Sequence, residues 1–263
     1  MVNPISYCPV CGEPTARVVT FGDNSFTLPL ACKCARARQK EFEEETERNR
    51  RMFRNDEIIR NGYLDSYYTE LTFEKDDSPS SKPSVDLRRY VEKWEQMKEK
   101  NIGLLLMGSY GTGKTFYASA IANEVRKLGD YVLIGTLSKL IQSMNEDYGR
   151  DKADWEHKIK TYPLMVIDDL GVERDTDYSY EQIENIIDLR YRSHMPVIVT
   201  TNISKEDLQN LNDVRKERVW SRLREMCTAY VISGEDRRRN KAKEKQEAFK
   251  TLIGGQDAER NNS

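Results

Sequence analysis

The chain has 263 residues, 33% of them charged, with a net charge of −2 and a pI of about 5.9. This length allows one or two domains, and the near balance of charge excludes a polycation that wraps DNA over its whole surface. The longest apolar runs, such as 102–107, are far shorter than the ~20 residues that span a bilayer. The N-terminus lacks the basic flank and apolar core of a signal peptide. We therefore expect a cytoplasmic protein without a membrane partner, in which any nucleic-acid surface is local.

Four of the five cysteines lie at the start of the chain, as the pairs Cys8-x2-Cys11 and Cys32-x-Cys34. In a reducing compartment such clustering favours metal ligation over disulfides. Four thiolates at this spacing suit a tetrahedral structural zinc ion, which would stabilise a module too small for a large core. Redox-active thiols are the alternative, although no thioredoxin-like βαβ pattern surrounds them. The stretch VVTFGDNSFTLPL between the pairs predicts two short strands around Gly22-Asp23-Asn24.

The next segment, from Ala35 to about Arg60, is rich in Arg, Glu and Lys and contains no Pro or Gly. It predicts an exposed helix, and the balance of its charges favours a connecting helix over a nucleic-acid-binding stripe. After the loop DDSPSSKPS, predicted strands and helices alternate, with strands at GLLLMG, YVLIG, LMVIDD, PVIVTTN and TAYVISG. This alternation predicts an α/β fold whose parallel sheet lies between helices. We expect the tail, residues 241–263, to be basic, then polar, and disordered.

The stretch GSYGTGKT, residues 108–115, fits the phosphate-binding pattern G-x-x-x-x-G-K-[ST] between a predicted strand and a predicted helix. Lys114 would reach the β- and γ-phosphates of ATP, and Thr115 would bind Mg²⁺. A purely structural glycine turn is the alternative, which the strand–loop–helix context disfavours. The predicted nucleotide-binding residues are Gly108, Ser109, Tyr110, Gly111, Thr112, Gly113, Lys114, Thr115 and Phe116.

Polar side chains follow two further predicted strands. Asp168 and Asp169 end the run LMVIDD, where Asp168 would hold Mg²⁺ and Asp169 would polarise the attacking water. Asn202 ends the strand VIVTTN, and parallel sheets present ligand sites at the carboxyl ends of their strands. Taken alone, each feature could be a strand leaving the core or an Asn turn. Together they predict catalytic groups beside the γ-phosphate.

Arginines occur near the end of this pattern, at Arg218 and Arg222 in ERVWSRLRE and at Arg237 to Arg239 in GEDRRRN. A guanidinium group stabilises developing phosphate charge, and one supplied by a neighbouring subunit makes hydrolysis depend on assembly. Most surface arginines have no such role, so residue type alone assigns none of them.

The motifs GSYGTGKT, LMVIDDLG, VIVTTNIS, ERVWSRL and ISGEDRRR occur in an order that resembles the AAA+ ATPases of the bacterial helicase-loader group, DnaC and DnaI, and their relative IstB. The resemblance runs from about Gly62 to Gly234 and implies an AAA+ P-loop NTPase fold. It implies that Lys114 and Thr115 are Walker A residues, Asp168 and Asp169 the Walker B pair, Asn202 sensor 1, Arg222 the trans-acting arginine finger and Arg238 sensor 2. Arg218 remains an alternate finger, and the RRR run leaves Arg237 and Arg239 open as sensor 2. Asp169 stands where most AAA+ ATPases have Glu.

The resemblance also implies a function and a division of the chain. Residues 1–60 would form a zinc-binding, helicase-interacting module with a charged linker helix, 61–240 the ATPase domain, and 241–263 the tail. The protein would load a DnaB-type replicative helicase onto single-stranded DNA and self-associate into a helical or ring-like oligomer. It would hydrolyse ATP to ADP and phosphate, and assembly and single-stranded DNA would stimulate this hydrolysis. An IstB-like transposition helper is the alternative within the class. A non-enzymatic zinc adaptor and a small-molecule kinase are alternatives from other classes.

Overall fold

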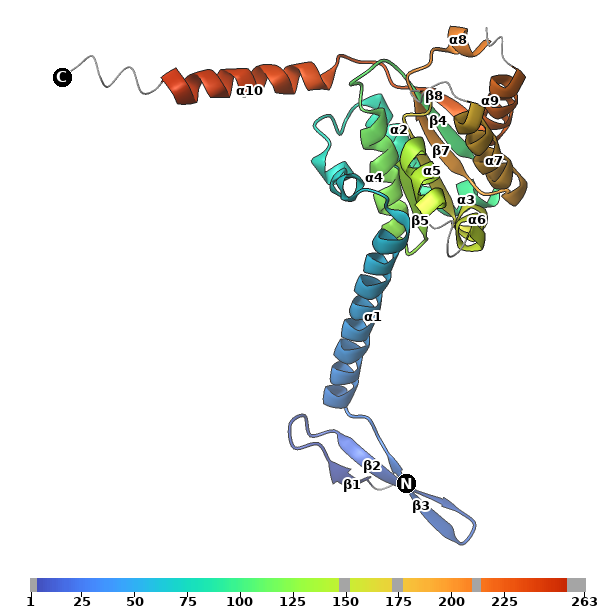
Figure 1. The fold of residues 1–263 in the computed structure, drawn as a ribbon. Helices are drawn as coiled ribbons and strands as arrows, with labels where there is room; N and C mark the ends of the chain where they lie inside the picture. The colour runs from blue at the N-terminus through green and yellow to red at the C-terminus, as the bar shows by residue number, and fades with distance from the viewer. Residues whose placement is uncertain (1–3, 147–151, 172–176, 210–213, 255–263) are drawn as a thin grey trace, which may run out of the picture. The chain divides into compact units, whose positions relative to one another are not determined.

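The computed structural model describes residues 4–146, 152–171, 177–209 and 214–254 and divides into two compact units, Met1–Asp56 and Glu57–Ser263 (Figure 1). The division falls within the long helix α1 (Lys33–Gly62), near the expected boundary between residues 60 and 61. Within the described ranges, no helix is both long and apolar enough to cross a membrane.

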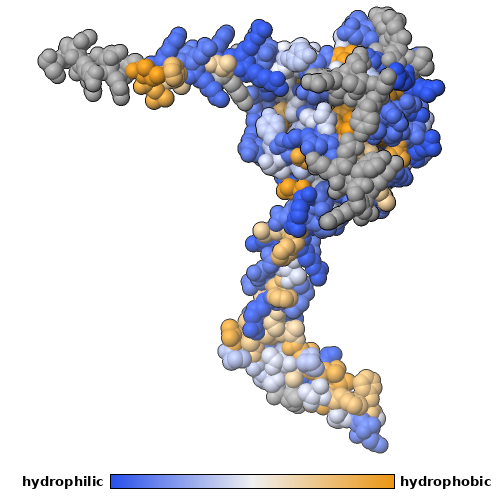
Figure 2. Space-filling view, viewed as in Figure 1, coloured by the Kyte–Doolittle hydropathy of each residue, from blue (hydrophilic) through white to orange (hydrophobic). Residues whose placement is uncertain are grey.

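The N-terminal unit contains an antiparallel sheet in the order β1 (Pro4–Tyr7), β2 (Pro14–Phe21) and β3 (Asn24–Pro29). Val19 lies directly opposite Phe26, and Phe21 and Leu28 share their face because side chains alternate along a strand. Phe21, Phe26 and Leu28 are all exposed. Figure 2 shows the resulting apolar surface in orange on this unit.

Helix α1 is held mainly by local interactions. Between Lys33 and Gly62 its sequence consists mostly of strong helix formers, and Arg51 forms an ion pair with Glu47 one turn away. The last residues of α1, from Glu57 onward, belong to the second unit, and the side chain of Ile58 is buried in the core of that unit. The charged segment is therefore an exposed helix, as its composition predicts.

The second unit is built on a parallel five-stranded sheet in the order β5-β6-β7-β4-β8. The strands are β5 (Val132–Thr136), β6 (Leu164–Asp168), β7 (Val197–Thr201), β4 (Gly103–Met107) and β8 (Cys227–Val231). Every residue of β4, β6 and β7 is buried, because helices cover both faces of a parallel sheet. The predicted α/β fold with a parallel sheet is confirmed.

Alternate residues of the strands supply two apolar cores, one on each face of the sheet. Leu105 and Met107 point to one core, and Leu104 and Leu106 to the other. The first core is completed by α5 (Leu137–Glu146), α6 (Lys152–Thr161), α7 (Asp177–Ser193), α8 (Lys205–Gln209) and α9 (Val214–Met226). The second is completed by α2 (Lys82–Glu92), α3 (Trp94–Glu99), α4 (Lys114–Lys127) and the short 3-10 helices η1 (Ser66–Glu70) and η2 (Phe73–Lys75). The result is a three-layered α/β/α unit (Figure 1).

A buried arginine ties three of these elements together. Arg190 on α7 is inaccessible to solvent, and burial lowers its pKa to about 9. Its guanidinium donates hydrogen bonds of 2.5–3.2 Å to four backbone carbonyls, which precede β6 and β7 or end α6. These carbonyls belong to Ile159, Tyr162, Pro163 and Pro196.

The C-terminal segment differs from the expectation of a disordered tail over 241–263. Helix α10 (Arg237–Gly254) covers most of it, and residues 255–263 lie outside the described residues. The physical reason is helix propensity: Lys, Glu, Gln and Ala dominate and no Pro or Gly precedes Gly254. High charge alone was therefore a poor guide to disorder here.

Candidate nucleotide-binding site

The phosphate loop connects β4 to α4 and depends on glycine at two positions. Gly111 and Gly113 have φ values of 76° and 102°, in the left-handed region that other residues rarely adopt. Gly113 caps the N-terminus of α4, so the free N–H groups of that helix and its dipole favour an anion at the loop. The loop thus has the backbone geometry of a phosphate-binding site.

Lys114 lies at the first turn of α4 and is almost fully buried. Its Nζ donates a hydrogen bond of 2.7 Å to the carbonyl of Ser109. Burial lowers the pKa of Lys114, the charge of Asp169 opposes that shift, and the nearby positive charge of Arg238 adds to it. The ammonium group is therefore held among the acidic and basic groups that the sequence predicts for this site.

The acidic end of β6 is organised by hydroxyl groups. Oδ1 of Asp168 accepts hydrogen bonds from Oγ1 of Thr115 at 2.9 Å and of Thr200 at 2.7 Å. Its Oδ2 accepts one from the hydroxyl of Tyr68 at 3.4 Å. Burial raises the pKa of Asp168, and these hydroxyls oppose that shift. Adjacent hydroxyl and carboxylate oxygens at Thr115 and Asp168 fit the oxygen ligands that Mg²⁺ prefers.

Asp169 and Asn202 meet at the next position along this edge of the sheet. Asp169 has a left-handed backbone with φ 59°, and its N–H donates to Oγ1 of Thr200 at 2.8 Å. Nδ2 of Asn202 donates to Oδ1 of Asp169 at 3.2 Å. The Asn202 side chain is thereby in contact with the carboxylate that the sequence assigns to water activation.

Several of these groups line one cavity of about 240 Å³. Its polar lining includes Lys114, Thr115, Asp169, Asn202 and Arg238. Its remaining lining comes from the segment before α2, the phosphate loop, α4 and the start of α10, namely Tyr67, Leu71, Lys75, Asp77, Tyr110, Gly111, Gly113, Phe116 and Arg237. The structure therefore brings together predicted residues from β6, β7, α4 and the start of α10.

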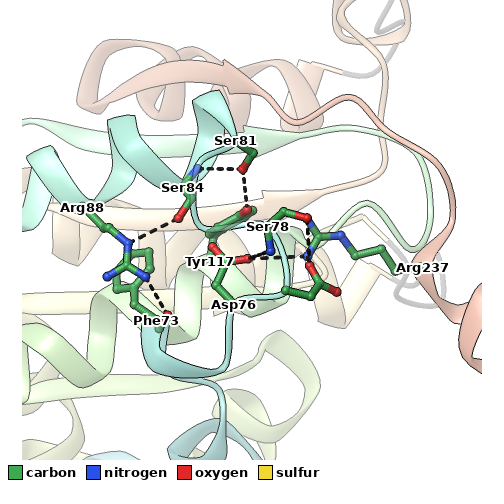
Figure 3. A network of polar contacts seen from close by, with 9 residues as sticks. Phe73, Asp76, Ser78, Ser81, Ser84, Arg88, Tyr117 and Arg237 are labelled. Atoms are coloured by element: carbon green, nitrogen blue, oxygen red, sulfur yellow. Dashed lines mark hydrogen bonds and ion pairs between the residues drawn. The ribbon is translucent and has the colours of Figure 1, made fainter.

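The three consecutive arginines at the start of α10 have different surroundings. Arg237 forms an ion pair of 2.7 Å with Asp77, and its guanidinium lies 5.9 Å from the ring centre of Tyr117 (Figure 3). Arg237 and Arg238 both line the cavity. The side chain of Arg239 is 84% exposed. Of the three, Arg238 is thus the one whose charge acts on Lys114.

The start of α10 also packs directly against the phosphate loop. The N–H of Arg237 donates to the carbonyl of Gly111 at 3.1 Å, and Oδ1 of Asp236 caps the helix by accepting the N–H of Arg238. A Cβ atom at Gly111 would lie 1.7 Å from Oδ1 of Asp236. Gly111 is therefore required both by its backbone conformation and by this close approach.

Arg218 and Arg222 lie elsewhere, on α9 facing α7. Arg222 forms an ion pair of 2.7 Å with Asp188, and its side chain is 28% exposed. Arg218 lies 3.7 Å from Glu184 and is 64% exposed. Among the described residues that line the cavity, neither arginine occurs. The structure does not bring these two residues to the nucleotide site of their own chain.

The four N-terminal cysteines form a second candidate site, in the first unit. Their Sγ atoms all lie within 4.8 Å of one another, and none is in a disulfide. Cys8 and Cys32 are buried. A hydrogen bond from the backbone at Glu13 is the main cause that lowers the pKa of Cys11 to about 6, whereas the hydrogen bond between Cys34 and Cys11 raises the pKa of Cys34 to about 11, so that Cys11 is the thiol favoured as thiolate. This set fits a tetrahedral zinc ion.

Sequence reasoning missed several residues of the nucleotide site. Thr200 contacts both aspartates, and a signal existed in its position two residues before Asn202 at the end of a strand. Tyr68 and Asp77 lie far from the motifs in sequence, and nothing local marks them. Their roles follow from the way residues 63–78 pack against α4 and α10.

The parallel sheet, the phosphate loop after β4, the acidic pair after β6 and the asparagine after β7 define a P-loop ATP-binding protein of the AAA+ class. The chain belongs to the family described as IstB-like ATP binding protein, which matches residues 43–246. The predicted resemblance is confirmed.

Two relatives in this class are helicase loaders. The chain is 31% identical over 158 residues to the replicative helicase loader DnaC of Escherichia coli (strain K12), which covers 59% of this chain and 62% of that protein. It is 25% identical over 150 residues to the replicative helicase loader DnaI of Bacillus subtilis (strain 168), covering 53% and 48%. The match thus spans less than two thirds of the length of each relative. The crystal structure of the DnaC helicase loader superposes with a TM-score of 0.55 at 28% identity, over 64% of this chain and all of that one.

Proposed function

We propose that the protein is an ATP-dependent loader that places a DnaB-type replicative helicase on single-stranded DNA. The observation that carries the proposal is the similarity to replicative helicase loaders over the ATP-binding domain. The groups needed for γ-phosphoryl chemistry around the 240 Å³ cavity support an active ATPase over a vestigial site.

The site residues suggest how ATP would be hydrolysed. The phosphate loop and Lys114 hold the phosphates, and Thr115 with Asp168 would hold Mg²⁺, which neutralises charge on the β- and γ-phosphates when bound. Asp169, held by Asn202, orients and polarises the water that attacks the γ-phosphorus. The bond between the γ-phosphorus and the β,γ-bridging oxygen breaks, giving ADP and phosphate, while Arg238 stabilises charge on the γ-phosphate.

Assembly would complete this site. Arg222 of a neighbouring copy, with Arg218 as the alternate, supplies the remaining positive charge to the γ-phosphate. In the single chain Arg222 is paired with Asp188, so engagement in trans requires it to exchange that partner. ATP then acts mainly as an assembly switch within a helical or ring-like oligomer on single-stranded DNA.

The N-terminal unit would bind the helicase in the cytoplasm. Zinc held by Cys8, Cys11, Cys32 and Cys34 stabilises the small sheet, since a unit with so little core needs a covalent or metal cross-link. The exposed apolar face of Phe21, Phe26 and Leu28 offers a surface of the kind that mediates protein contacts.

A pull-down with the host's replicative helicase, with and without ATP, tests the proposal. We expect capture of the helicase, and ATP-dependent transfer of that helicase to circular single-stranded DNA, measured as unwinding of an annealed oligonucleotide. The Lys114→Ala variant controls for the nucleotide and should capture helicase without transferring it. If the protein captures no helicase with ATP and none without ATP, the loader function is ruled out.

A further inference from the structure

The segment between α1 and α2 reaches the acidic end of β6 through one buried tyrosine. Tyr68, on η1, is 4% exposed, and its hydroxyl lies 3.4 Å from Oδ2 of Asp168. The other carboxylate oxygen, Oδ1, already accepts two hydroxyl hydrogen bonds, from Thr115 and Thr200. Within the described parts of the chain, Tyr68 is the side chain that donates to Oδ2. The hydrogen bond from Tyr68 therefore fixes the rotation of the Asp168 carboxylate about its Cβ–Cγ bond. The two contacts to Oδ1 alone leave this rotation less restricted.

A buried asparagine holds the tyrosine in place. Asn123 lies in the middle of α4 with no solvent exposure, and its Nδ2 donates to the carbonyls of Tyr68 at 2.8 Å and Leu71 at 2.9 Å. Its Oδ1 accepts a hydrogen bond of 3.2 Å from the hydroxyl of Tyr63. Both amide protons and the carbonyl oxygen of Asn123 are thus used to hold residues 63–71 on α4. A buried network that is satisfied in this way is rigid.

The same segment contributes to the cavity. Tyr67 and Leu71 line it on either side of Tyr68 in sequence. The backbone that positions Tyr68 against Asp168 is therefore also the backbone against which a nucleotide would lie. One rigid segment, residues 63–71, thus connects the Asp168 carboxylate with the cavity that would hold the nucleotide.

We propose that Tyr68 is a positioning residue that orients the Asp168 carboxylate for Mg²⁺, acting through its hydrogen bond to Oδ2. The inference rests on the proposed function to the extent that the site must bind ATP with Mg²⁺. Tyr68 contacts the carboxylate rather than the nucleotide, so its hydroxyl influences the metal-dependent part of binding and leaves the metal-independent part unchanged. The ring, in contrast, serves the apolar core.

The test compares Tyr68→Phe with the matched control Tyr90→Phe. Tyr90 is also buried, and its hydroxyl donates to a backbone carbonyl, that of Ile102 at 2.7 Å, outside the cavity. Binding of a fluorescent ATP analogue is titrated with Mg²⁺ and repeated in EDTA. For Tyr68→Phe we expect the Mg²⁺ concentration at half-maximal binding to rise about three- to tenfold, the effect of losing one hydrogen bond of ordinary strength, because the contact is long and acts on Mg²⁺ only through the carboxylate. Affinity in EDTA should stay at the wild-type value, and Tyr90→Phe should match wild type in both titrations.

A second measurement asks whether the effect passes through Asp168. In an Asp168→Asn background, Tyr68→Phe should cause no further loss of Mg²⁺ dependence, because the carboxylate it orients is gone. An equal loss in both backgrounds, an unchanged Mg²⁺ titration, or a parallel loss in EDTA would each overturn the proposal. Failure of Tyr68→Phe to fold, judged by thermal unfolding, would overturn it too, since the hydroxyl would then serve the core. Wild-type protein that shows no Mg²⁺-dependent ATP binding would instead refute the ATPase function itself.

Discussion

Arg237, Arg238 and Arg239 follow one another in the chain, yet their side chains meet different groups. Arg237 and Arg238 both line the nucleotide cavity, but the guanidinium of Arg237 is paired with Asp77, and Arg239 is largely exposed. Successive residues of a helix point about 100° apart, so a run of identical residues distributes its charges over different surroundings. The composition of the run is therefore a poor guide to which arginine acts on phosphate.

This difference predicts a distinct result for each alanine variant. Arg238→Ala should lower ATP affinity or turnover by about tenfold or more, because the proposed charge-assisted contact to the γ-phosphate would be lost. Arg239→Ala should match wild type. Arg237→Ala should lower the thermal unfolding temperature, since its ion pair joins α10 to the loop at Asp77. Arg237 also lines the cavity, but its loss should reduce ATP affinity less than Arg238→Ala does, because its guanidinium is already paired with a carboxylate. Steady-state ATPase rates and thermal unfolding of the three variants decide the matter, and a larger catalytic loss in Arg239→Ala would exclude Arg238 as sensor 2.

A mixing experiment tests the arginine finger. We expect Arg222→Ala to retain ATP affinity and to lose turnover in the assembled state, because the proposed role of Arg222 is to act on a neighbour's nucleotide. Lys114→Ala should lose nucleotide binding while keeping Arg222 available. Mixed together, the two inactive proteins should recover part of the ATPase activity. If instead Arg218→Ala, and not Arg222→Ala, shows complementation, the more exposed arginine is the finger.

At this scale, the sequence predicts residues that lie in local motifs. Asp168 ends a recognisable strand, and Lys114, Asp169 and Asn202 follow such strands. The structure places the last three around one cavity and Asp168 in hydrogen-bond contact with Thr115, which also lines that cavity. Tyr68 was not predictable in this way, because its contact with Asp168 joins residues a hundred positions apart.

At the scale of elements, the buried Arg190 shows how α7 is fixed to the sheet. Its guanidinium has no carboxylate partner among the described residues and is satisfied by backbone carbonyls instead. These carbonyls lie where the chain enters β6 and β7. The arginine thus holds the beginning of the two strands whose other ends carry Asp168 and Asn202.

Replacement of Arg190 should therefore be costly. We expect Arg190→Met to lower the free energy of unfolding by about 3–5 kcal/mol, because several buried carbonyls lose their hydrogen-bond donor at once. Arg190→Lys should be intermediate, since an ammonium cannot reach all of these carbonyls. Arg192→Met is the matched control: Arg192 lies on the same helix with a side chain that is 74% exposed, and the change should stay within about 0.5 kcal/mol. Urea unfolding measures all three, and a small effect of Arg190→Met would show that water or repacking satisfies the carbonyls.

Elements were predictable where periodicity was strong and less so where composition was ambiguous. The buried strands and the exposed helix α1 followed directly from apolar runs and helix formers. Helix α10 was missed because a highly charged, polar segment satisfies the compositional signature of disorder and of an exposed helix alike. Arg190 gave no signal, since a surface arginine and a buried one look the same in a helical pattern.

At the scale of the whole molecule, the chain separates its two candidate sites into different units. The cysteine cluster belongs to the first unit and the ATP-binding cavity to the second. Each site is built from residues of its own unit, so each should tolerate damage to the other. This separation is the physical basis for the proposed division of labour between partner binding and nucleotide chemistry.

The Cys8→Ser variant tests that division. We expect it to lose zinc, measured by elemental analysis, and to lose capture of the helicase, because the small sheet depends on the metal. ATP affinity should remain at the wild-type value. Cys227→Ser is the control, since Cys227 is buried beside β7 and lies outside the cluster. Undiminished helicase capture by zinc-free Cys8→Ser would separate the cysteine site from partner binding.

The left-handed backbone of Asp169 bears on how fast such a molecule can turn over ATP. Asp is among the residues that tolerate φ near 59°, whereas a longer unbranched acid gains nothing from that conformation. Asp169→Glu would introduce the residue found in most AAA+ ATPases. The longer side chain would bring the carboxylate closer to the γ-phosphate, but it would fit the left-handed backbone at this position less well. The backbone conformation of this turn would thus keep ATP hydrolysis slow. Slow hydrolysis would leave each assembled complex enough time to place the proposed helicase on DNA before its ATP is hydrolysed.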